Sequence, residues 1–354
     1  MKAVAVSPTT FRLPLNRTLE AHSRPTPTPD LAAFFEHRLG QLPTSAAVCE
    51  SVWQDTLYAP LKAFLARSGK LFRARLVQHG WRLAGGRGEA PQTLCLLPEI
   101  LHSASLIVDD IQDGAATRRG GPALHRVIGP ERALNAANWL YFWPYQLLDE
   151  LRLPAARRRA CQDLITGTLL DCHRGQALDL GAEVWALAQD DLPALVAEQS
   201  RLKTGRLTAL CVGLGALAAG ARPRRVDTLQ RFGEQVGVAL QMLDDLTAVL
   251  SPARHDKAGE DLCTGRPTFA WVLAAQRCSE FTYRALQQQG RAAAGGADWQ
   301  PLRALLAETI GDDPLDYPRA ALAEAGALLG GSDLPAAAVQ EVLTDLERLE
   351  RAYG

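Results

Sequence analysis

Hydrophobic residues recur with a helical period along nearly the whole chain from Asp30 onward. Apolar positions three and four residues apart are typical of helices that bury one face, and Asp30 stands where an N-cap would begin the first of them. The longer periodic stretches are 48–67, 70–84, 92–113, 131–152, 156–181, 191–220, 224–250, 267–289, 299–311 and 335–352. Breaks fall at Gly85-Gly86, Gly120-Gly121-Pro122, Gly295-Gly296 and Gly330-Gly331. No run of alternating β-branched residues indicates a sheet.

Helices in this number, with no linker after residue 45, predict a single all-α domain over residues 30–354. Residues 1–29 are rich in Thr, Pro and Arg and contain one acidic residue, Glu20. We expect them to form a disordered leader, with an organelle transit peptide as the alternative. They contain no apolar segment typical of a signal peptide.

Composition excludes several classes of function. The chain is 47% hydrophobic and 22% charged, with a net charge of −1, which favours neither nucleic acid nor an anionic membrane as a partner. No apolar run reaches the roughly 18–20 residues of a membrane span. The seven cysteines are scattered without a CxxC pair, which indicates reduced thiols in the cytoplasm rather than disulfides or a zinc site.

Residues 102–125, HSASLIVDDIQDGAATRRGGPALH, contain a DDxxD cluster and a pair of arginines. The apolar residues before the cluster predict a buried helix, on which Asp109 and Asp113 would lie on one face about 5–6 Å apart. Two such carboxylates repel each other, so a cation between them is expected. Mg²⁺ fits, because it is usually held by one or two carboxylates and substrate phosphates. Taken alone, the cluster could equally be a solvated acidic helix end.

A second apolar helix, in LQMLDDLTAVL, places Gln241, Asp244 and Asp245 on a shared face. Only the fold can bring this motif to the first one, because they are far apart in the sequence. Two carboxylate helices facing one cavity would bind several divalent ions, and those ions would bind a polyphosphate. The pair of motifs therefore predicts a metal-dependent site for a diphosphate.

Further cations stand in three other segments. Each pair alone is typical of a solvated surface. The segments are SGKLFR with Lys70 and Arg73, RLKTGRLT with Lys203 beside Thr204, and HDKAGEDLCTGRPT with Lys257 and Arg266.

Taken in order, these motifs resemble those of trans-isoprenyl diphosphate synthases, the polyprenyl synthetase family, from about residue 65 to residue 345. The set is GKxxR at 69–73, DDxxD with RRG at 109–120, GQxxD at 175–179, KT at 203–204, QxxDD at 241–245 and KxGxDL at 257–262. The phrases ALNAANWLYF, LDCHRGQALDL and EDLCTGRPTF are similar to the geranylgeranyl diphosphate synthases of animals and fungi. The resemblance implies the isoprenoid synthase fold, a large bundle of ten or more helices around a central cavity, and a homodimer.

The same resemblance implies an enzyme of isoprenoid biosynthesis. It would condense isopentenyl diphosphate with an allylic diphosphate, expected to be farnesyl diphosphate, to give geranylgeranyl diphosphate. Ionisation of the allylic substrate leaves negative charge on the departing diphosphate, which fixed Mg²⁺ and Lys or Arg side chains would stabilise. The leaving group itself can then take the proton that ends the condensation.

The resemblance also assigns roles to individual residues. Three Mg²⁺ ions would be bound by Asp109, Asp113 and Asp244 directly, and by Asp179 and Asp245 through water. The allylic diphosphate would be held by Arg118, Lys203 and Lys257, and isopentenyl diphosphate by Lys70, Arg73, His102 and Arg119. Gly69 and Arg266 belong to the same substrate-binding motifs. The carbocation would face Thr204, Gln241 and the carbonyl of Lys203.

One position departs from the family pattern, and two rival functions stay open. Farnesyl diphosphate synthases usually carry a third aspartate where this chain has Ala248, but the animal and fungal subgroup commonly lacks it. A terpene cyclase on the same fold would not need the set predicted to bind isopentenyl diphosphate. A non-catalytic partner subunit typically loses an aspartate motif, and this chain keeps the magnesium ligands of both.

Product length should depend on the residues below Asp109. Ala104 and Ser105 lie about one turn below it, roughly 5–8 Å along the helix axis, and both are too small to stop a C15 product. Tyr141, Phe142 and His173 match positions that close the tunnel in the animal and fungal enzymes, which predicts a C20 product; an ordinary core role is the alternative. Pro144, beside Trp139 and Trp143, predicts a break or bulge in its helix.

Overall fold

The computed structural model of the chain describes residues 30–39, 46–67, 69, 71–251, 255–330 and 333–351, with the side chains of 255–258 and 260 outside the description. The leader predicted for residues 1–29 therefore lies outside the described residues.

Helices make up most of the described chain, as the periodicity predicts. The first half consists of α1 (Leu31–Leu39), α2 (Ala47–Trp53), the π-helical turn η1 (Gln54–Tyr58), α3 (Ala59–Leu65), α4 (Phe72–Leu83), α5 (Gln92–Gln112), the strands β1 (Thr117–Arg118) and β2 (Gly121–Pro122), α6 (Leu124–Ile128), α7 (Pro130–Asp149) and α8 (Ala155–Gly181). Asp30 caps α1 as predicted, because its Oδ1 accepts from the backbone N–H of Ala32 at 2.9 Å.

The second half continues in the same way. Its elements are the 3₁₀ turn η2 (Val184–Ala186), α9 (Leu192–Ser200), the π-helical turn η3 (Arg201–Gly205), α10 (Arg206–Ala219), α11 (Pro223–Leu250), α12 (His255–Thr264), α13 (Phe269–Arg277), α14 (Glu280–Ala294), α15 (Gln300–Ile310), α16 (Asp316–Gly330) and α17 (Ala336–Arg351). The all-α fold is confirmed.

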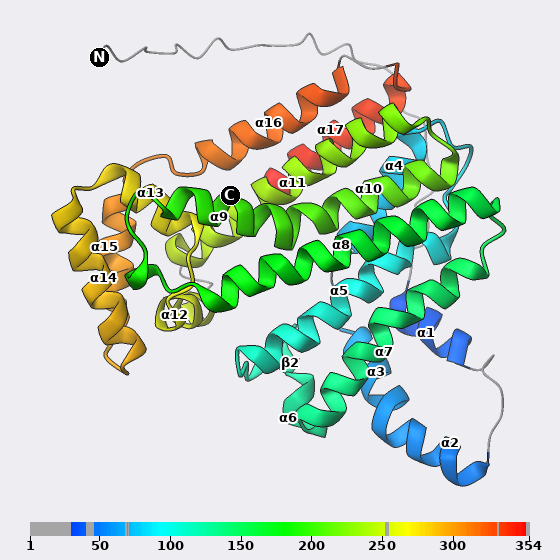
Figure 1. Cartoon of the computed structure of the whole chain (residues 1–354), viewed down its shortest axis with the longest axis horizontal. Coiled ribbons are helices and arrows are strands. Elements are labelled where there is room, and N and C mark those ends of the chain that lie inside the picture. The colour runs from blue at the N-terminus through cyan, green and yellow to red at the C-terminus, as the bar shows by residue number, and fades with distance from the viewer. Residues whose placement is uncertain are drawn as a thin grey trace.

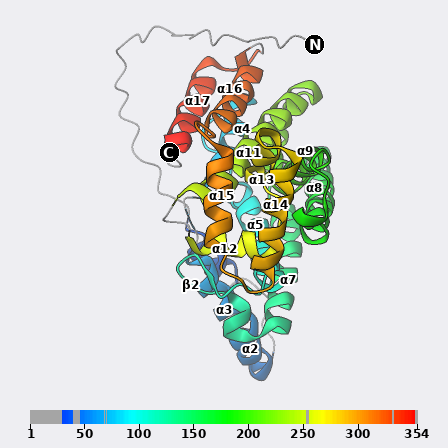
Figure 2. The ribbon, with the colours of Figure 1, turned by 90° about the vertical axis from the view of Figure 1, so that its left-hand side faces the viewer.

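The long helices α5, α8, α10 and α11 run side by side through the middle of the molecule (Figure 1). The larger group of buried apolar side chains lies among them and extends to α1, α4, α7 and α16. A smaller group lies among α9, α12, α13, α14 and α15, which form the end that faces the viewer in Figure 2. The acidic ends of α5 and α8 point toward this second group of helices, and that arrangement positions the site.

Several details of the helix prediction are wrong, and α12 (His255–Thr264) and α16 (Asp316–Gly330) lie outside every predicted stretch. The stretch 267–289 is two helices, because the backbone is extended at Cys278 and Ser279. Ser279 caps α14, since its Oγ accepts from the N–H of Thr282 at 3.2 Å. Pro144 does not interrupt α7, which is α-helical from Pro130 to Asp149. Proline removes one N–H donor there, but the helix continues through it and buries its ring.

That packing explains the tryptophans of α7. Trp139 and Trp143 stack with centroids 5.1 Å apart, and Phe35 of α1 packs edge-on against Trp143 at 5.3 Å. Aromatic pairs of this geometry stabilise a core beyond the area they bury. The tryptophans therefore join α1 to α7 as core residues.

One continuous helical stretch of the described residues, Leu192–Ala219, has the length and apolar composition that crossing a membrane requires. In the fold, 72% of its most apolar window is buried inside the protein. Central helices of protein cores commonly meet this criterion, so the stretch is weak evidence for a membrane span.

Candidate active site

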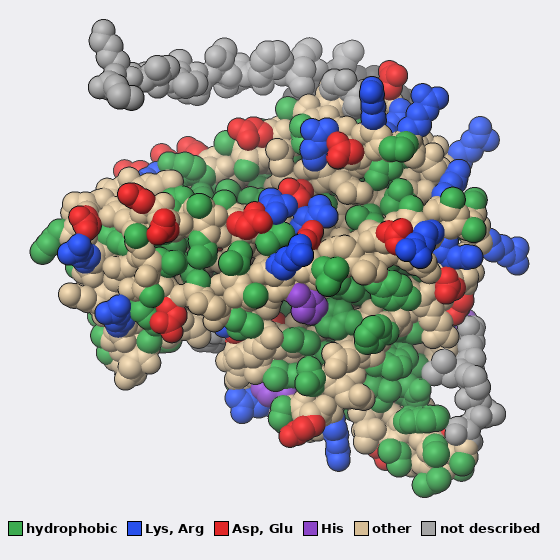
Figure 3. All heavy atoms as spheres, viewed as in Figure 1, with side chains coloured by type: hydrophobic (Ala, Val, Ile, Leu, Met, Phe, Trp, Pro, Cys, Tyr) green, Lys and Arg blue, Asp and Glu red, His purple; other side chains and the backbone are tan. Residues whose placement is uncertain are grey.

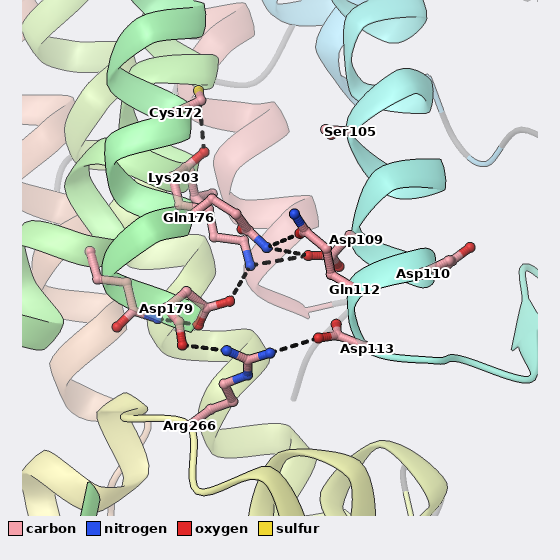
Figure 4. Close-up of polar contacts among 12 residues, drawn as sticks. Ser105, Asp109, Asp110, Gln112, Asp113, Cys172, Gln176, Asp179, Lys203 and Arg266 are labelled. Atoms are coloured by element: carbon pink, nitrogen blue, oxygen red, sulfur yellow. Dashed lines mark hydrogen bonds and ion pairs between the residues drawn. The ribbon is translucent and has the colours of Figure 1, made fainter. Parts of the chain in front are cut away.

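The carboxylates of the first acidic motif divide between two environments at the end of α5. Asp109 and Asp113 point toward α8, whereas Asp110 points away from it (Figure 4). Asp110 is fully buried and accepts from Arg118 Nε at 2.6 Å. Burial, followed by the charge of Asp109, raises the pKa of Asp113 above its ordinary value. Asp113 therefore needs nearby cations to stay ionised.

One of these cations is Lys203, which stands in the π-helical turn η3. Its Nζ lies 2.7 Å from Asp179 Oδ2 on α8 and 3.4 Å from Asp109 Oδ1 on α5. Burial alone would lower the pKa of Lys203, but the charges of Asp109 and Asp179 outweigh it and raise the pKa. Lys203 is therefore a fixed positive charge between the two acidic helices.

A second cation, Arg266, joins the same helices from the loop that follows α12. Its Nη2 donates to Asp113 Oδ1 at 2.8 Å, and its Nη1 donates to the carbonyl of Asp179. The loop turns at Gly265, whose φ is +68° and whose missing Cβ would lie 2.3 Å from the ring of Trp185. Only glycine fits this conformation and this close contact without strain, so Gly265 and Trp185 set the direction of Arg266.

The second acidic motif, on α11, forms a chain of hydrogen bonds with η3. The hydroxyl of Thr204 donates to Gln241 Oε1 at 2.6 Å, and Gln241 Nε2 donates to Asp245 Oδ1 at 2.8 Å. The other oxygen of Asp245 accepts from the N–H of Phe269 at 2.8 Å. Both Asp245 oxygens are thus engaged by protein donors, whereas Asp244 is half-buried beside it.

These groups surround one cavity of about 320 Å³. It lies between α5, α8, η3, α11 and the α12–α13 loop, and polar side chains make up most of its wall. The predicted site residues among its lining are Asp109, Asp113, Arg118, Asp179, Lys203, Gln241, Asp245 and Arg266.

A basic cluster adjoins this cavity at the start of α4. Arg73, His102 and Arg119 lie close enough that both arginines, after burial itself, lower the pKa of His102 well below its ordinary value. His102 is thus neutral at pH 7 and would bind a ligand by hydrogen bonding. Arg73 Nε and Arg119 Nη1 are buried and have no hydrogen-bond partner among the described residues. Buried donors of this kind are rare, and an anion would satisfy them.

Two predicted site residues cannot be placed, and a third shows no packing that calls for its residue type. Lys70 and the side chain of Lys257 lie outside the described residues. Gly69 is exposed, and its missing Cβ would meet no atom within 4 Å, so nothing there requires a glycine.

The donor set fits magnesium that is bound together with a substrate. Within the described part of the chain, no three Asp, Glu, His or Cys residues are grouped closely enough to hold a metal by themselves. Asp109 and Asp113 nevertheless offer oxygen ligands on one face of the cavity. Mg²⁺ commonly uses one or two carboxylates and completes its shell with substrate phosphates and water, so these residues suffice for that mode.

The residues predicted to set product length are partly brought together. Ala104 is buried, and Ser105 faces the gap between α5 and α8 (Figure 4). Tyr141 packs against His173 with ring centroids 5.7 Å apart. Phe142 is 73% exposed, so its predicted role in product length is not supported by its position in a single chain.

Sequence reasoning missed several residues that organise the site. Gln176 donates to Asp109 Oδ1 at 3.1 Å and to Gln112 Oε1 at 2.9 Å, and Gln199 donates to Asp179 Oδ1 at 2.6 Å. Glu99 is buried and accepts from the first N–H groups of α4, at 2.9 Å from Arg73 N. Gln176 stands inside the GQxxD motif, which could have identified it as a site residue. Gln199 and Glu99 belong to none of the motifs described above.

Comparison with known proteins agrees with this geometry. Residues 54–296 match the polyprenyl synthetase family. A geranylgeranyl diphosphate synthase of Mycobacterium tuberculosis is 34% identical over 68% of each chain. A geranylgeranyl pyrophosphate synthase of Penicillium janthinellum is 31% identical over 69% of this chain and 65% of its own length, slightly less than two thirds.

Solved structures give the same result for the fold. The geranylgeranyl pyrophosphate synthase of Corynebacterium glutamicum, solved with isoprenyl diphosphate and magnesium, superposes with a TM-score of 0.73 at 24% identity, covering 92% of this chain and 96% of that one. The chain belongs to the polyprenyl synthetase family. The family and the isoprenoid synthase fold predicted from the motifs are confirmed.

Proposed function

We propose that the protein is a magnesium-dependent geranylgeranyl diphosphate synthase that condenses isopentenyl diphosphate with farnesyl diphosphate. The observation that carries this proposal is the pair of adjoining anion sites. One is the cavity with Asp109, Asp113, Lys203 and Arg266, and the other is the cluster around Arg73. A condensation needs two diphosphates side by side, and relatives that match most of this chain bear the name of this activity.

The residues of the chain divide the reaction between them. Lys203 and Arg118 hold the allylic diphosphate and stabilise the charge that develops on it as the C–O bond breaks. Bound Mg²⁺ would supply further neutralisation of the same oxygens. Asp245 accepts a hydrogen bond from the Gln241 amide, and the Gln241 oxygen accepts one from the Thr204 hydroxyl. The oxygens of Thr204 and Gln241 present their dipoles to the allylic cation. Arg73, His102 and Arg119 hold isopentenyl diphosphate, and the leaving diphosphate accepts the proton.

The second candidate, a terpene cyclase, would bind one diphosphate and leave the donors of Arg73 and Arg119 without a ligand. Incubation with isopentenyl diphosphate, each allylic diphosphate and Mg²⁺, followed by mass spectrometry, separates the functions. A C20 diphosphate supports the proposal. A hydrocarbon formed without isopentenyl diphosphate supports the cyclase, and no product with any primer supports a non-catalytic partner subunit.

We also propose a homodimer in a reducing compartment such as the cytoplasm. Exposed apolar side chains of α6, α7 and α8 support the dimer: Val127, Leu134, Phe142 and Leu170. Figure 3 shows hydrophobic side chains gathered on the face over α7 and α8. A patch of this kind commonly marks a protein interface, and sedimentation equilibrium measures whether it joins two chains. The seven free thiols support the compartment.

Arg73→Ala should raise the KM for isopentenyl diphosphate about 10–100-fold, because hydrogen bonds to a charged group contribute roughly 1.5–3 kcal/mol each. The KM for the allylic diphosphate should stay within about twofold, since loss of uniform binding to one substrate appears in its own KM. Arg75→Ala is the matched control, because Arg75 is exposed on the same helix. Unchanged isopentenyl kinetics in Arg73→Ala would favour the cyclase.

Tyr141→Ala should lengthen the product from C20 to C25 or beyond, because the ring that packs on His173 is proposed to close the product tunnel. Tyr145→Ala is the control, since Tyr145 stands one turn later on α7 and bonds Thr166 at 2.8 Å. Product lengths are read by mass spectrometry. A C20 product from both variants would remove Tyr141 from the tunnel floor.

A further inference from the structure

The π-helical turn η3 interrupts a helix that otherwise runs from Leu192 to Ala219. In this turn the N–H of Arg206 donates to the carbonyl of Arg201, five residues earlier. Such turns are rare and occur often at functional sites. Lys203 and Thr204 stand in its middle and reach different partners, Lys203 the carboxylates of α5 and α8 and Thr204 the amide of Gln241. The conformation of this one turn therefore determines the positions of both Lys203 and Thr204.

Backbone packing confines the turn from two sides. On the α8 side, the missing Cβ of Gly175 would lie 2.6 Å from the nitrogen of Lys203. On the α11 side, the missing Cβ of Gly237 would lie 2.8 Å from the carbonyl oxygen of Thr204. The thiol of Cys172 lies 3.7 Å from the carbonyl oxygen of Lys203 (Figure 4). The turn thus fits closely between α8 and α11.

Charged side chains contact the two ends of the turn. Glu234 of α11 packs directly on the turn, because the missing Cβ of Gly205 would lie 3.1 Å from both its Cγ and its carbonyl oxygen. Its Oε2 lies 3.6 Å from Arg201 Nη1 and 3.4 Å from Arg206 Nη1. Arg201 begins the turn and Arg206 follows it, so one carboxylate contacts both ends.

Each of the two arginines also has a partner of its own. Arg206 Nε donates to Asp171 Oδ2 on α8 at 2.9 Å, and Arg201 Nη2 donates to Glu198 in the preceding helical turn at 2.7 Å. Asp171 thus ties the far end of the turn to α8, while Glu234 ties both ends to α11. Without Glu234, Arg206 would keep Asp171 and Arg201 would keep Glu198, but the carboxylate that contacts both arginines and ties them to α11 would be lost.

We propose that Glu234 is a positioning residue that holds Arg201 and Arg206 and so fixes how η3 presents Lys203 and Thr204. This proposal rests on the proposed prenyl transfer, and it adds a residue that touches no substrate. Small displacements of groups at a reacting centre are costly, and about 1 Å can reduce the rate about a hundredfold. The ion pairs themselves are partly exposed and screened, so the effect should be on geometry more than on stability.

The test combines kinetics with hydrogen exchange in Glu234→Gln. The kcat should fall about tenfold, the KM for isopentenyl diphosphate should stay within about twofold, and amides of residues 201–208 should exchange faster. Asp227→Asn is the matched control. It removes the same charge from the same helix, where Asp227 pairs with Arg231 at 3.0 Å and does not contact η3. The control should resemble the wild type in both measurements.

Several outcomes would overturn the proposal. One is unchanged exchange over 201–208 in Glu234→Gln, and another is faster exchange with kcat unchanged. An equal loss in Asp227→Asn would mean that only the net charge matters. If Glu234→Gln unfolds, Glu234→Asp keeps the charge on a shorter stem and should give an intermediate kcat; wild-type kinetics in that variant would also count against it. A wild-type protein without prenyl transfer would refute the proposed function, while the exchange measurement still judges the role of Glu234.

Discussion

Asp109→Asn is expected to lower kcat by about 10²–10³, the loss typical of removing one strong electrostatic contact from a site that stabilises developing charge. Asparagine keeps the shape of the side chain and its reach to Gln176, but it removes a negative oxygen from the face shared with Asp113. The variant should also need a higher Mg²⁺ concentration for half-maximal rate. Steady-state rates over a Mg²⁺ titration measure both effects.

The control for this variant is Asp163→Asn on α8. Asp163 is exposed and pairs with Arg159 of its own helix, at 2.9 Å. It should keep the wild-type rate and the wild-type Mg²⁺ dependence. If Asp109→Asn kept more than about half of the wild-type kcat, Asp109 would not be a metal ligand. The same measurements on Asp244→Asn test the second acidic motif.

Much of the fold follows from local signals in the sequence. The periodic stretch 92–113 became α5 and the stretch 224–250 became α11 within one or two residues, because each buries one continuous apolar face. The break between α13 and α14 was missed because the apolar period continues across it. Ser279, followed three residues later by Thr282, was the local sign of a new helix.

The shape of η3 could not be predicted in the same way. The period of 191–220 indicates one helix, and the extra residue of a π-helical turn leaves the apolar pattern on either side nearly intact. The signal lies instead in partners far away in the sequence: Gly175 and Gly237 allow the close approach, and Glu234 contacts both ends. Such tertiary contacts become visible only when the helices are placed.

The sequence predicted which residues belong to the site, but not which cation pairs with which carboxylate. The motifs identified Asp109, Asp179, Lys203 and Arg266 as members of one site. Which cation meets which carboxylate depends on the positions of α5, α8 and the α12–α13 loop, and Arg266 reaches Asp113 from 153 residues further along the chain. Asp110 illustrates the limit, because it belongs to the same DDxxD cluster and yet is buried against Arg118.

Lys203→Met is expected to lower kcat/KM for the allylic diphosphate by about 10²–10³, because it removes the positive charge and keeps most of the apolar stem. The ammonium lies between Asp109 and Asp179, so its loss leaves both carboxylates with less neutralisation. The variant should therefore bind Mg²⁺ at least as tightly as the wild type, opposite to Asp109→Asn. A Mg²⁺ titration beside allylic-substrate kinetics measures this contrast.

Lys62→Met provides the comparison for Lys203→Met. Lys62 is exposed on α3 and pairs with Glu36 of α1, far from the cavity. The same substitution there should change neither the Mg²⁺ dependence nor the allylic kinetics. Weaker Mg²⁺ binding in Lys203→Met would mean that the lysine supports the metal site instead of balancing its charge. Unchanged allylic kinetics would mean that Lys203 does not hold the diphosphate, and that the charge between α5 and α8 serves only to join the two helices.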